Sequence, residues 1–221
     1  MHRRRRVASS DPNERRLKHN LRTVARPKRD RAIESELKFR VSGPEDHHKL
    51  RLLLRERGAK VGAHYREENY RFNGPGKSTR NTSLRLRVLN GGPHGVLTAK
   101  GPATFDGGVK SREETEIDVK DVHATLDLLE QLGFRVAWTY PKRRSVWVLD
   151  GVAVTLDVLD FGYFVEFEGP ASALPEMARS LGLDPADATR DSYSAMARKH
   201  MKRQPATRTS GMPVSTLAPR S

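Results

Sequence analysis

Residues 32–41 read Ala32-Ile33-Glu34-Ser35-Glu36-Leu37-Lys38-Phe39-Arg40-Val41. Apolar and charged side chains alternate along this segment, which is the pattern of a β-strand with two different faces. One face carries Ile33, Leu37, Phe39 and Val41, and the other carries Glu34, Glu36, Lys38 and Arg40. The second face combines both signs of charge at successive positions of one strand.

Other predicted strands repeat this property, with charged residues in phase on the face opposite the apolar one. The pattern predicts strands over residues 65–72, 83–89, 96–100, 109–119, 135–149, 152–159 and 161–168, with Pro141 as a point where one of them could break. It predicts helices over residues 44–59, 121–132 and 171–181, and a last short helix that begins near Pro185 or Asp191. Consecutive strands with short connections favour a largely antiparallel sheet and hence the α+β class.

The predicted helices are too few to cover the apolar face of a flat sheet with this many strands. A sheet curled into a barrel, with the helices outside and the charges inside, uses the same elements better. The alternative is an ordinary sheet whose charged face meets solvent. A closed lumen lined by both signs of charge is unfavourable when it is empty. It becomes favourable around a polyanion, since Arg and Lys bind phosphate oxygens and carboxylates at spacing i, i+2 suit Mg²⁺ or Mn²⁺.

The segments that carry these charges resemble a known family. Glu34-Ser35-Glu36-Leu37-Lys38 is similar to the ExExK signature of the CYTH family, the triphosphate tunnel metalloenzymes. The resemblance covers residues 32–200 and continues, in order, through residues 68–72, 84–87, 97–102, 112–116, 132–134, 142–144, 156–157, 162–168 and 192–193. Ten motifs in one order make the resemblance specific.

The resemblance implies an α+β fold in which an eight-stranded antiparallel β-barrel forms a triphosphate tunnel with helices packed outside. It implies that substrate phosphates are bound by Lys38, Arg85, Arg87, Lys100, Arg112, Lys142 and Arg144. It implies that Mg²⁺ or Mn²⁺ is held by Glu34, Glu36, Asp157, Glu166 and Glu168. Glu114 and Glu116 would lie near the metal or position water. The C-terminal helix, which carries Tyr193, would close one mouth of the tunnel. The predicted catalytic residues are Lys38, Glu114, Glu116 and Tyr193. Asn69 stands where relatives often have Asp, and we assign it no role.

The family includes class IV adenylate cyclases, thiamine triphosphatases and inorganic triphosphatases, so the resemblance implies a phosphorus–oxygen lyase or a triphosphate hydrolase. The segments Leu97–Pro102 and Leu132–Phe134 favour the cyclase branch, which converts ATP to cyclic AMP and pyrophosphate. Two alternatives stay open. One is a triphosphatase that acts on tripolyphosphate or thiamine triphosphate, and the other is a module that binds a polyphosphate or nucleotide without turning it over.

The net charge of +14 lies in the two ends of the chain. Residues 1–31 carry a net charge of +9 and residues 198–221 a net charge of +6, which leaves about −1 for the part between them. We therefore expect a basic disordered tail over residues 1–31, a tunnel domain over 32–200 and a second disordered tail over 201–221, with weak nucleic-acid or polyanion binding confined to the tails. An RNA-binding protein that works through these tails is a further alternative.

The composition also bears on where the protein works. The sequence has no Cys, which excludes disulfides and a thiolate metal site and fits a reducing, cytoplasmic setting. No apolar run approaches the ~18 residues of a membrane span, so we expect no membrane partner. A homodimer is left open.

Overall fold

The computed structural model describes residues 32–76 and 81–203, so the tail expected over residues 1–31, and all of the tail expected over residues 201–221 except 201–203, lie outside this part. The strands are β1 (Ala32–Val41), β2 (Lys60–Asn73), β3 (Ser83–Leu89), β4 (Gly95–Lys100), β5 (Thr104–Asp106), β6 (Val109–Val119), β7 (Arg135–Leu149), β8 (Val152–Leu159) and β9 (Gly162–Glu168). The helices are α2 (Pro44–Glu56), α3 (Val122–Gln131), α4 (Leu174–Ser180) and α5 (Tyr193–Arg203), with a 3-10 turn at Pro185–Asp187. None of these helices is long and apolar enough to cross a membrane.

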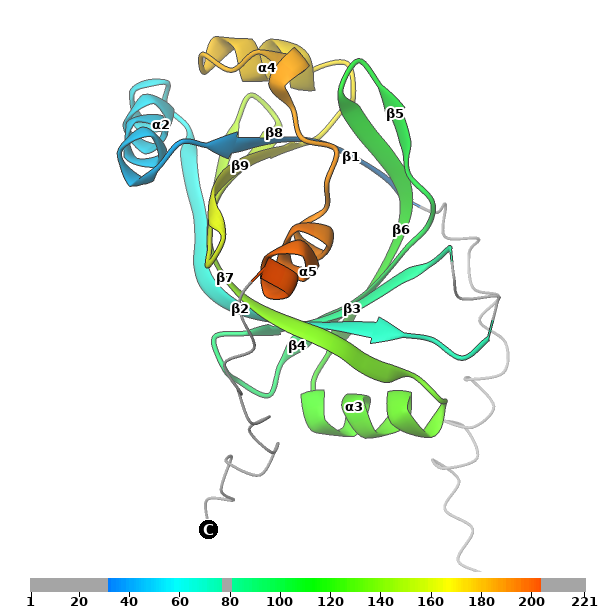
Figure 1. Cartoon of the computed structure of the whole chain (residues 1–221). Coiled ribbons are helices and arrows are strands. Elements are labelled where there is room, and N and C mark those ends of the chain that lie inside the picture. The colour runs from blue at the N-terminus through cyan, green and yellow to red at the C-terminus, as the bar shows by residue number, and fades with distance from the viewer. Residues whose placement is uncertain (1–31, 77–80, 204–221) are drawn as a thin grey trace, which may run out of the picture. The chain divides into compact units, whose positions relative to one another are not determined.

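Eight of the strands form a closed antiparallel barrel. Their order is β1-β9-β8-β7-β2-β3-β4-β6, and the pairing of β1 with β6 closes the ring, while the short β5 pairs with β6 alone. At the closure, Glu34 lies opposite Arg112 and Glu36 opposite Lys110. On its other side, β1 pairs with β9, with Lys38 opposite Glu166. The predicted α+β barrel is confirmed, and Figure 1 shows the ring of strands in a view along the barrel.

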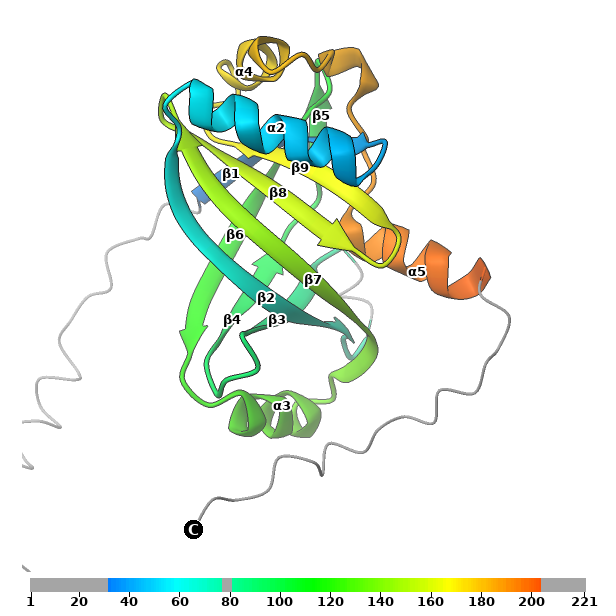
Figure 2. The ribbon, with the colours of Figure 1, turned by 90° about the vertical axis from the view of Figure 1, so that its left-hand side faces the viewer.

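The hydrophobic core lies mainly outside the barrel, between the strands and the helices. The outward side chains of β1, β8 and β9 pack with α2 and α4 in one cluster, where Leu37, Leu54 and Phe167 are fully buried. A second cluster joins β2 and β3 to α3. A third cluster places Tyr193 and Met196 of α5 against Phe164. Helix α5 lies across one opening of the barrel (Figures 1 and 2), which agrees with the closed mouth that the resemblance implied.

Most predicted strands and helices are present in the structure, and local contacts explain the cap, turn and proline expected from the sequence. The side chain of Asp121 accepts a hydrogen bond from the amide of Ala124 and caps α3, as predicted. The β7–β8 hairpin turns at Asp150 and Gly151, which both have positive φ angles, as the tight turn expected there requires. Pro141 does not break β7. It lies opposite Glu68 of β2 but outside the β7–β8 pairing, which extends only to Arg143, so the missing amide removes no bond to β8.

Several other boundaries differ from the prediction. α2 ends at Glu56 instead of residue 59. β2 begins at residue 60 instead of 65 because its first residues pair with the end of β7. The predicted loop over residues 101–108 contains β5, which pairs with β6. α4 is confined to Leu174–Ser180 instead of residues 171–181. α5 continues through residue 203, three residues past the expected end of the domain, because no Gly or Pro interrupts it there.

Candidate functional site

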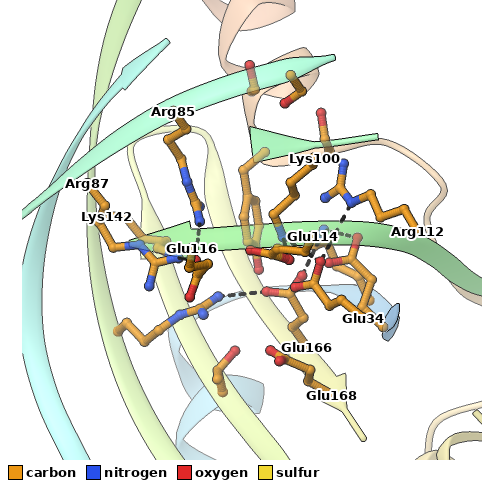
Figure 3. Close-up of a pocket in the computed structure, with 18 of the residues that line it drawn as sticks. Glu34, Arg85, Arg87, Lys100, Arg112, Glu114, Glu116, Lys142, Glu166 and Glu168 are labelled. Carbon is orange, nitrogen blue, oxygen red and sulfur yellow. Dashed lines mark hydrogen bonds and ion pairs between the residues drawn. The ribbon is translucent and has the colours of Figure 1, made fainter. Parts of the chain in front are cut away.

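The barrel encloses a cavity of about 540 Å³. It is lined by fourteen of the fifteen predicted site residues: Glu34, Glu36, Lys38, Arg85, Arg87, Lys100, Arg112, Glu114, Glu116, Lys142, Arg144, Glu166, Glu168 and Tyr193. The cavity lining includes eight Lys and Arg residues and six carboxylates. Every strand that contributes them presents its charged phase to the lumen, so the strand alternation places residues that are far apart in the sequence around one cavity (Figure 3).

The two signs of charge are unevenly distributed around the lumen. The neighbouring strands β1 and β9 contribute four of the lining carboxylates together with Lys38, whereas the charged lining residues of β2 and β3, which lie opposite them in the ring, are all cations. The acidic wall consists of Glu34, Glu36, Glu166 and Glu168. The basic wall consists of Arg71, Arg85 and Arg87. An extended anion with its counter-cation fits between two such walls.

The arginines of the basic wall are poorly paired within the protein. Arg85 and Arg87 reach Glu116 only at 3.9 and 3.8 Å, the contacts drawn in Figure 3. Arg71 has no ion pair with any residue that the structure describes. Among the described arginines that line the cavity, Arg71, Arg85, Arg87 and Arg112 each have a buried Nε atom without a hydrogen-bond partner. Since buried donors are normally paired, these guanidinium groups are arranged to receive an anion.

On the acidic wall, carboxylates lie next to one another. Glu34 contacts Glu114, and Lys100 lies between them at 2.5 Å from Glu34 and 2.6 Å from Glu114. Burial and then the hydrogen bond to Glu34 raise the pKa of Glu114. Burial by itself would also raise the pKa of Glu34, but the hydrogen bond from Glu114 and the charge of Lys100 outweigh burial and lower this pKa. The pair therefore shares one proton, and Glu114 can hold or release it near neutral pH.

Glu36 and Glu166 form a second carboxylate pair. Both contact Lys38, which lies 3.4 Å from Glu36 and 3.0 Å from Glu166. Burial opposes the charged form of Lys38, but these two carboxylates outweigh it and raise its pKa. Burial alone would raise the pKa of Glu166, whereas the positive charges of Lys38 and then Arg144 hold it well below its ordinary value. Lys110, which is in phase with Arg112 and which the sequence analysis missed, donates to Glu36 at 2.7 Å.

Asp157 is the one predicted site residue that does not line the cavity. It is completely buried, and its two oxygens accept hydrogen bonds of 2.7 and 2.6 Å from Arg144. Arg144 also donates to Glu166 at 2.6 Å. In this arrangement Asp157 orients Arg144 instead of presenting a free oxygen to the lumen.

Glu67 is a buried carboxylate that the sequence analysis did not single out. Its side chain is fully inaccessible, lies 3.0 Å from Lys142 and 3.9 Å from both Arg87 and Arg144, and accepts a hydrogen bond from Asn69. Burial works against its ionisation, but Lys142 and then the surrounding arginines lower its pKa to about 2. Burial and then the charge of Arg144 lower the pKa of Lys142 to about 8. Glu67 therefore balances the charge of a cationic cluster behind the lumen surface.

The signal that could have identified Glu67 and Arg71 is the phase of β2. Tyr70 and Phe72 pack outward in the cluster with α3, so Glu67, Asn69 and Arg71 must point inward. Asn69, which was given no role, is completely buried on this inner face.

Tyr193 lies at the mouth of the cavity with its ring against two lysines. The ammonium of Lys38 is 4.4 Å from the ring centroid and that of Lys142 is 5.2 Å from it. Burial, followed by the charges of Asp157 and Glu166, raises the pKa of Tyr193 well above its ordinary value. The hydroxyl group therefore stays protonated, and the ring positions the two cations.

The donor set fits a hard divalent cation. Adjacent carboxylates of β1 and β9, together with Glu114, supply the anionic oxygen ligands that Mg²⁺ and Mn²⁺ prefer. The contact between Glu34 and Glu114 is of the kind that a shared proton or a cation stabilises. As the side chains lie, their oxygens are occupied by lysine and arginine, and no three acidic or His side chains in residues 32–76 and 81–203 already converge on one point.

The model of the CYTH domain matches residues 32–193, which is well over half of the chain. The chain belongs to the CYTH family. A Methanocaldococcus jannaschii protein named as a putative adenylate cyclase is 27% identical over 150 residues, which are 67% of this chain and 83% of that protein.

Solved CYTH-like structures have the same fold. The PH1012 protein of Pyrococcus horikoshii is 27% identical with a TM-score of 0.62, and the match covers 72% of this chain and 96% of that one. A Hippeastrum protein described as a putative adenylyl cyclase with a dominant triphosphatase activity is 17% identical with a TM-score of 0.59, over 76% of this chain and 96% of that one.

Proposed function

We propose that this CYTH protein is a divalent-metal-dependent enzyme that acts on the triphosphate group of a nucleotide or another triphosphate. The observation that carries the proposal is the wall of half-buried, poorly paired arginines that faces a wall of carboxylates across one cavity. Several in-line phosphates supply the charges that these arginines lack, and a divalent cation supplies the charge that the carboxylates lack.

The residues have separable roles in this proposal. Arg71, Arg85 and Arg87 bind the phosphate chain from one side and hold it in line. Glu34, Glu36, Glu166 and Glu168 hold Mg²⁺ or Mn²⁺ on the other side. When bound, the ion neutralises charge that develops on the phosphate oxygens. Glu114 can accept the proton of the attacking hydroxyl or water once it has released the proton that it shares with Glu34.

The first reaction we propose is the conversion of ATP to cyclic AMP and pyrophosphate, and the name of the Methanocaldococcus relative supports it. In this reaction the ribose 3′-hydroxyl attacks the α-phosphorus. The second candidate is hydrolysis of a triphosphate by water. The cavity lining supports this candidate because 14 of its 24 residues are charged, and such a lining can bind phosphates without a nucleoside. The dominant triphosphatase activity described for the Hippeastrum protein is a reaction of this second kind.

The test is a product analysis with the purified full chain. ATP, tripolyphosphate and thiamine triphosphate are incubated separately with Mg²⁺ or Mn²⁺, and the products are separated by chromatography and identified by ³¹P NMR. Cyclic AMP with pyrophosphate supports the cyclase, and phosphate release without cyclic AMP supports the triphosphatase. Tight binding of all three compounds without turnover would leave only a binding module.

A matched pair of variants connects turnover to the lumen. Glu36→Gln removes a proposed metal-binding charge from the acidic wall and should reduce turnover by about two or more orders of magnitude. Asp118→Asn makes the same kind of change at an exposed position of β6 outside the cavity lining and should leave turnover unchanged. Full activity of a folded Glu36→Gln protein would contradict the proposed site.

A further inference from the structure

A second hollow of about 550 Å³ lies on the outer face of the barrel, beside α2. It is formed by α2, β2, β7 and β8, on the side of the barrel that faces the viewer in Figure 2. We call it the outer groove. Tyr65 and Arg144 line both the outer groove and the cavity, so a single layer of side chains separates the two.

The outer groove is lined by cations and histidines and has no carboxylate in its lining. The groups of interest are Arg51, Arg66, Arg143, His47, His48 and His64. An adjoining hollow, which shares Arg66 and Arg143 with the outer groove, is lined by the carboxylates of Glu67, Glu68 and Asp160.

Two of these arginines are held directly opposite each other. Arg66 of β2 and Arg143 of β7 are register partners in the antiparallel pairing. Like charges at such positions destabilise a sheet, and neither side chain has an ion pair within the described residues. A bound anion would convert this unfavourable pair into a two-sided binding site.

Unpaired buried groups lie in the same groove. His47 is 5% exposed, packs against the ring of Tyr163, and has an Nε2 atom without a hydrogen-bond partner in the described part of the chain. The buried Nε of Arg51, one turn further along α2, also lacks a partner there. His64 is fixed by a 2.8 Å hydrogen bond between its Nδ1 and the hydroxyl of Ser145. Buried polar atoms are normally satisfied, so the side chains of His47 and Arg51 are available to a ligand.

We propose that the outer groove is a second anion site, separate from the cavity, which binds the phosphate group of a small molecule. Arg66 and Arg143 contact the phosphate oxygens from the strand side, and Arg51 and His47 contact them from α2. A metal ion is a poorer match because the lining offers cations instead of anionic ligands, and no three His or acidic side chains in the described residues are grouped to hold one. The phosphate can come from a product such as pyrophosphate or from a nucleotide.

The test is a titration of the full chain with pyrophosphate, and in parallel with inorganic phosphate and AMP, in the absence of divalent metal. The imidazole signals of His47 and His64 are followed by NMR. The titration is carried out on the Arg85→Ala, Arg87→Ala double variant, in which binding in the cavity is weakened. We expect saturable shifts of both signals, and the most effective of the three compounds identifies the source of the phosphate.

The matched variant is Arg66→Gln with Arg143→Gln, which should weaken the measured affinity by about tenfold or more, because each lost contact is a charge-assisted hydrogen bond. Lys60→Gln, at an exposed position of β2 outside the groove, should not change it. Arg51→Gln provides an independent second variant on α2. Turnover in the cavity should stay within about twofold of that of the unmodified protein for the Arg66, Arg143 variant.

Three outcomes would overturn the proposal. The first is the absence of histidine shifts at millimolar concentrations of all three compounds. The second is shifts that both the Arg66, Arg143 variant and the Arg51 variant leave unchanged. The third is a response to an RNA oligonucleotide alone, which would assign the groove to a macromolecule. The readout needs no turnover, so it holds whatever reaction the cavity performs.

Discussion

Replacing Glu67 by Gln removes a negative charge from the middle of a cationic cluster while keeping the size of the side chain. Glu67 is buried within 4 Å of Lys142, Arg87 and Arg144. Its pKa falls from an ordinary 4.5 to about 2 in the folded protein. A shift of that size corresponds to about 3 kcal/mol of stabilisation at neutral pH. We therefore expect Glu67→Gln to lower the free energy of unfolding at pH 7 by about 3 kcal/mol in the ligand-free protein.

The pH dependence of this loss has a definite sign. Because the folded pKa of Glu67 is depressed, its stabilising contribution is complete above the unfolded pKa of about 4.5 and disappears as the pH falls toward 2. The difference between the unmodified protein and the variant should therefore be constant from pH 7 down to about 5. Below pH 4.5 it should shrink by about 1.4 kcal/mol per pH unit.

The assay is urea unfolding followed by the fluorescence of Trp138 and Trp147, at pH 7 and at pH 3.5. The control is Glu68→Gln on the same strand, where burial raises the pKa and loss of the charge should be neutral or slightly stabilising at pH 7. Tripolyphosphate should stabilise the Glu67→Gln protein more than the unmodified one, because the ligand replaces the missing negative charge. Equal stability of Glu67→Gln and the unmodified protein at pH 7 would refute the reasoning.

Three other side chains give predictions of different kinds. Arg71→Ala should weaken tripolyphosphate binding in a calorimetric titration by about tenfold or more. The melting temperature should not fall, because the arginine has no ion pair to lose among the described residues. Unchanged affinity would show that Arg71 does not bind the phosphate chain. Tyr193→Phe should keep turnover within a few-fold, whereas Tyr193→Ala should not, because the ring and not the hydroxyl contacts the lysines; a collapse of activity in the Phe variant would show a role for the hydroxyl. Tripolyphosphate affinity should fall as the pH rises above 8, where Lys142 loses its proton, and Lys142→Arg should make that fall smaller, leaving the part that comes from Glu114; an equal decline in both proteins would show that Lys142 is not the titrating group.

The strand alternation made the barrel and most of its lumen predictable. In β1, the apolar positions alternate with Glu34, Glu36 and Lys38, so the phase of the strand decides which side chains face inward. The same alternation in β2 leads to Glu67 and Arg71, which face inward because Tyr70 and Phe72, in the opposite phase of the strand, face outward. Those two residues were predictable in principle, although the resemblance to the family did not mark them.

The ion pairs could not be predicted in the same way. Asp157 was predicted as a metal ligand, and strand phase alone cannot show that both of its oxygens accept hydrogen bonds from Arg144. That contact depends on the register between β7 and β8, which brings the two residues opposite each other. Register and side-chain rotamers result from packing over the whole barrel and are not encoded in any one strand.

The two faces of each strand separate stability from substrate binding. Outward residues such as Leu37 and Phe167 pack under helices and form the core. The inward residues form ion pairs, and a complete pair contributes little net stability because the desolvation of its two charges costs about as much as their attraction gains. Removing one partner of such a pair is destabilising, because the other charge is left buried without compensation. Lumen charges therefore divide into two groups with opposite responses to substitution. A residue such as Glu67, which compensates neighbouring charges, is needed for the ligand-free fold. A residue such as Arg71 lacks an ion-pair partner in the described chain, so its substitution should not lower the free energy of unfolding. Its charge is paired only when an anion is bound. Measuring unfolding and triphosphate affinity on the same variants distinguishes the two groups, and residues of the second group are the ones that define what the tunnel binds.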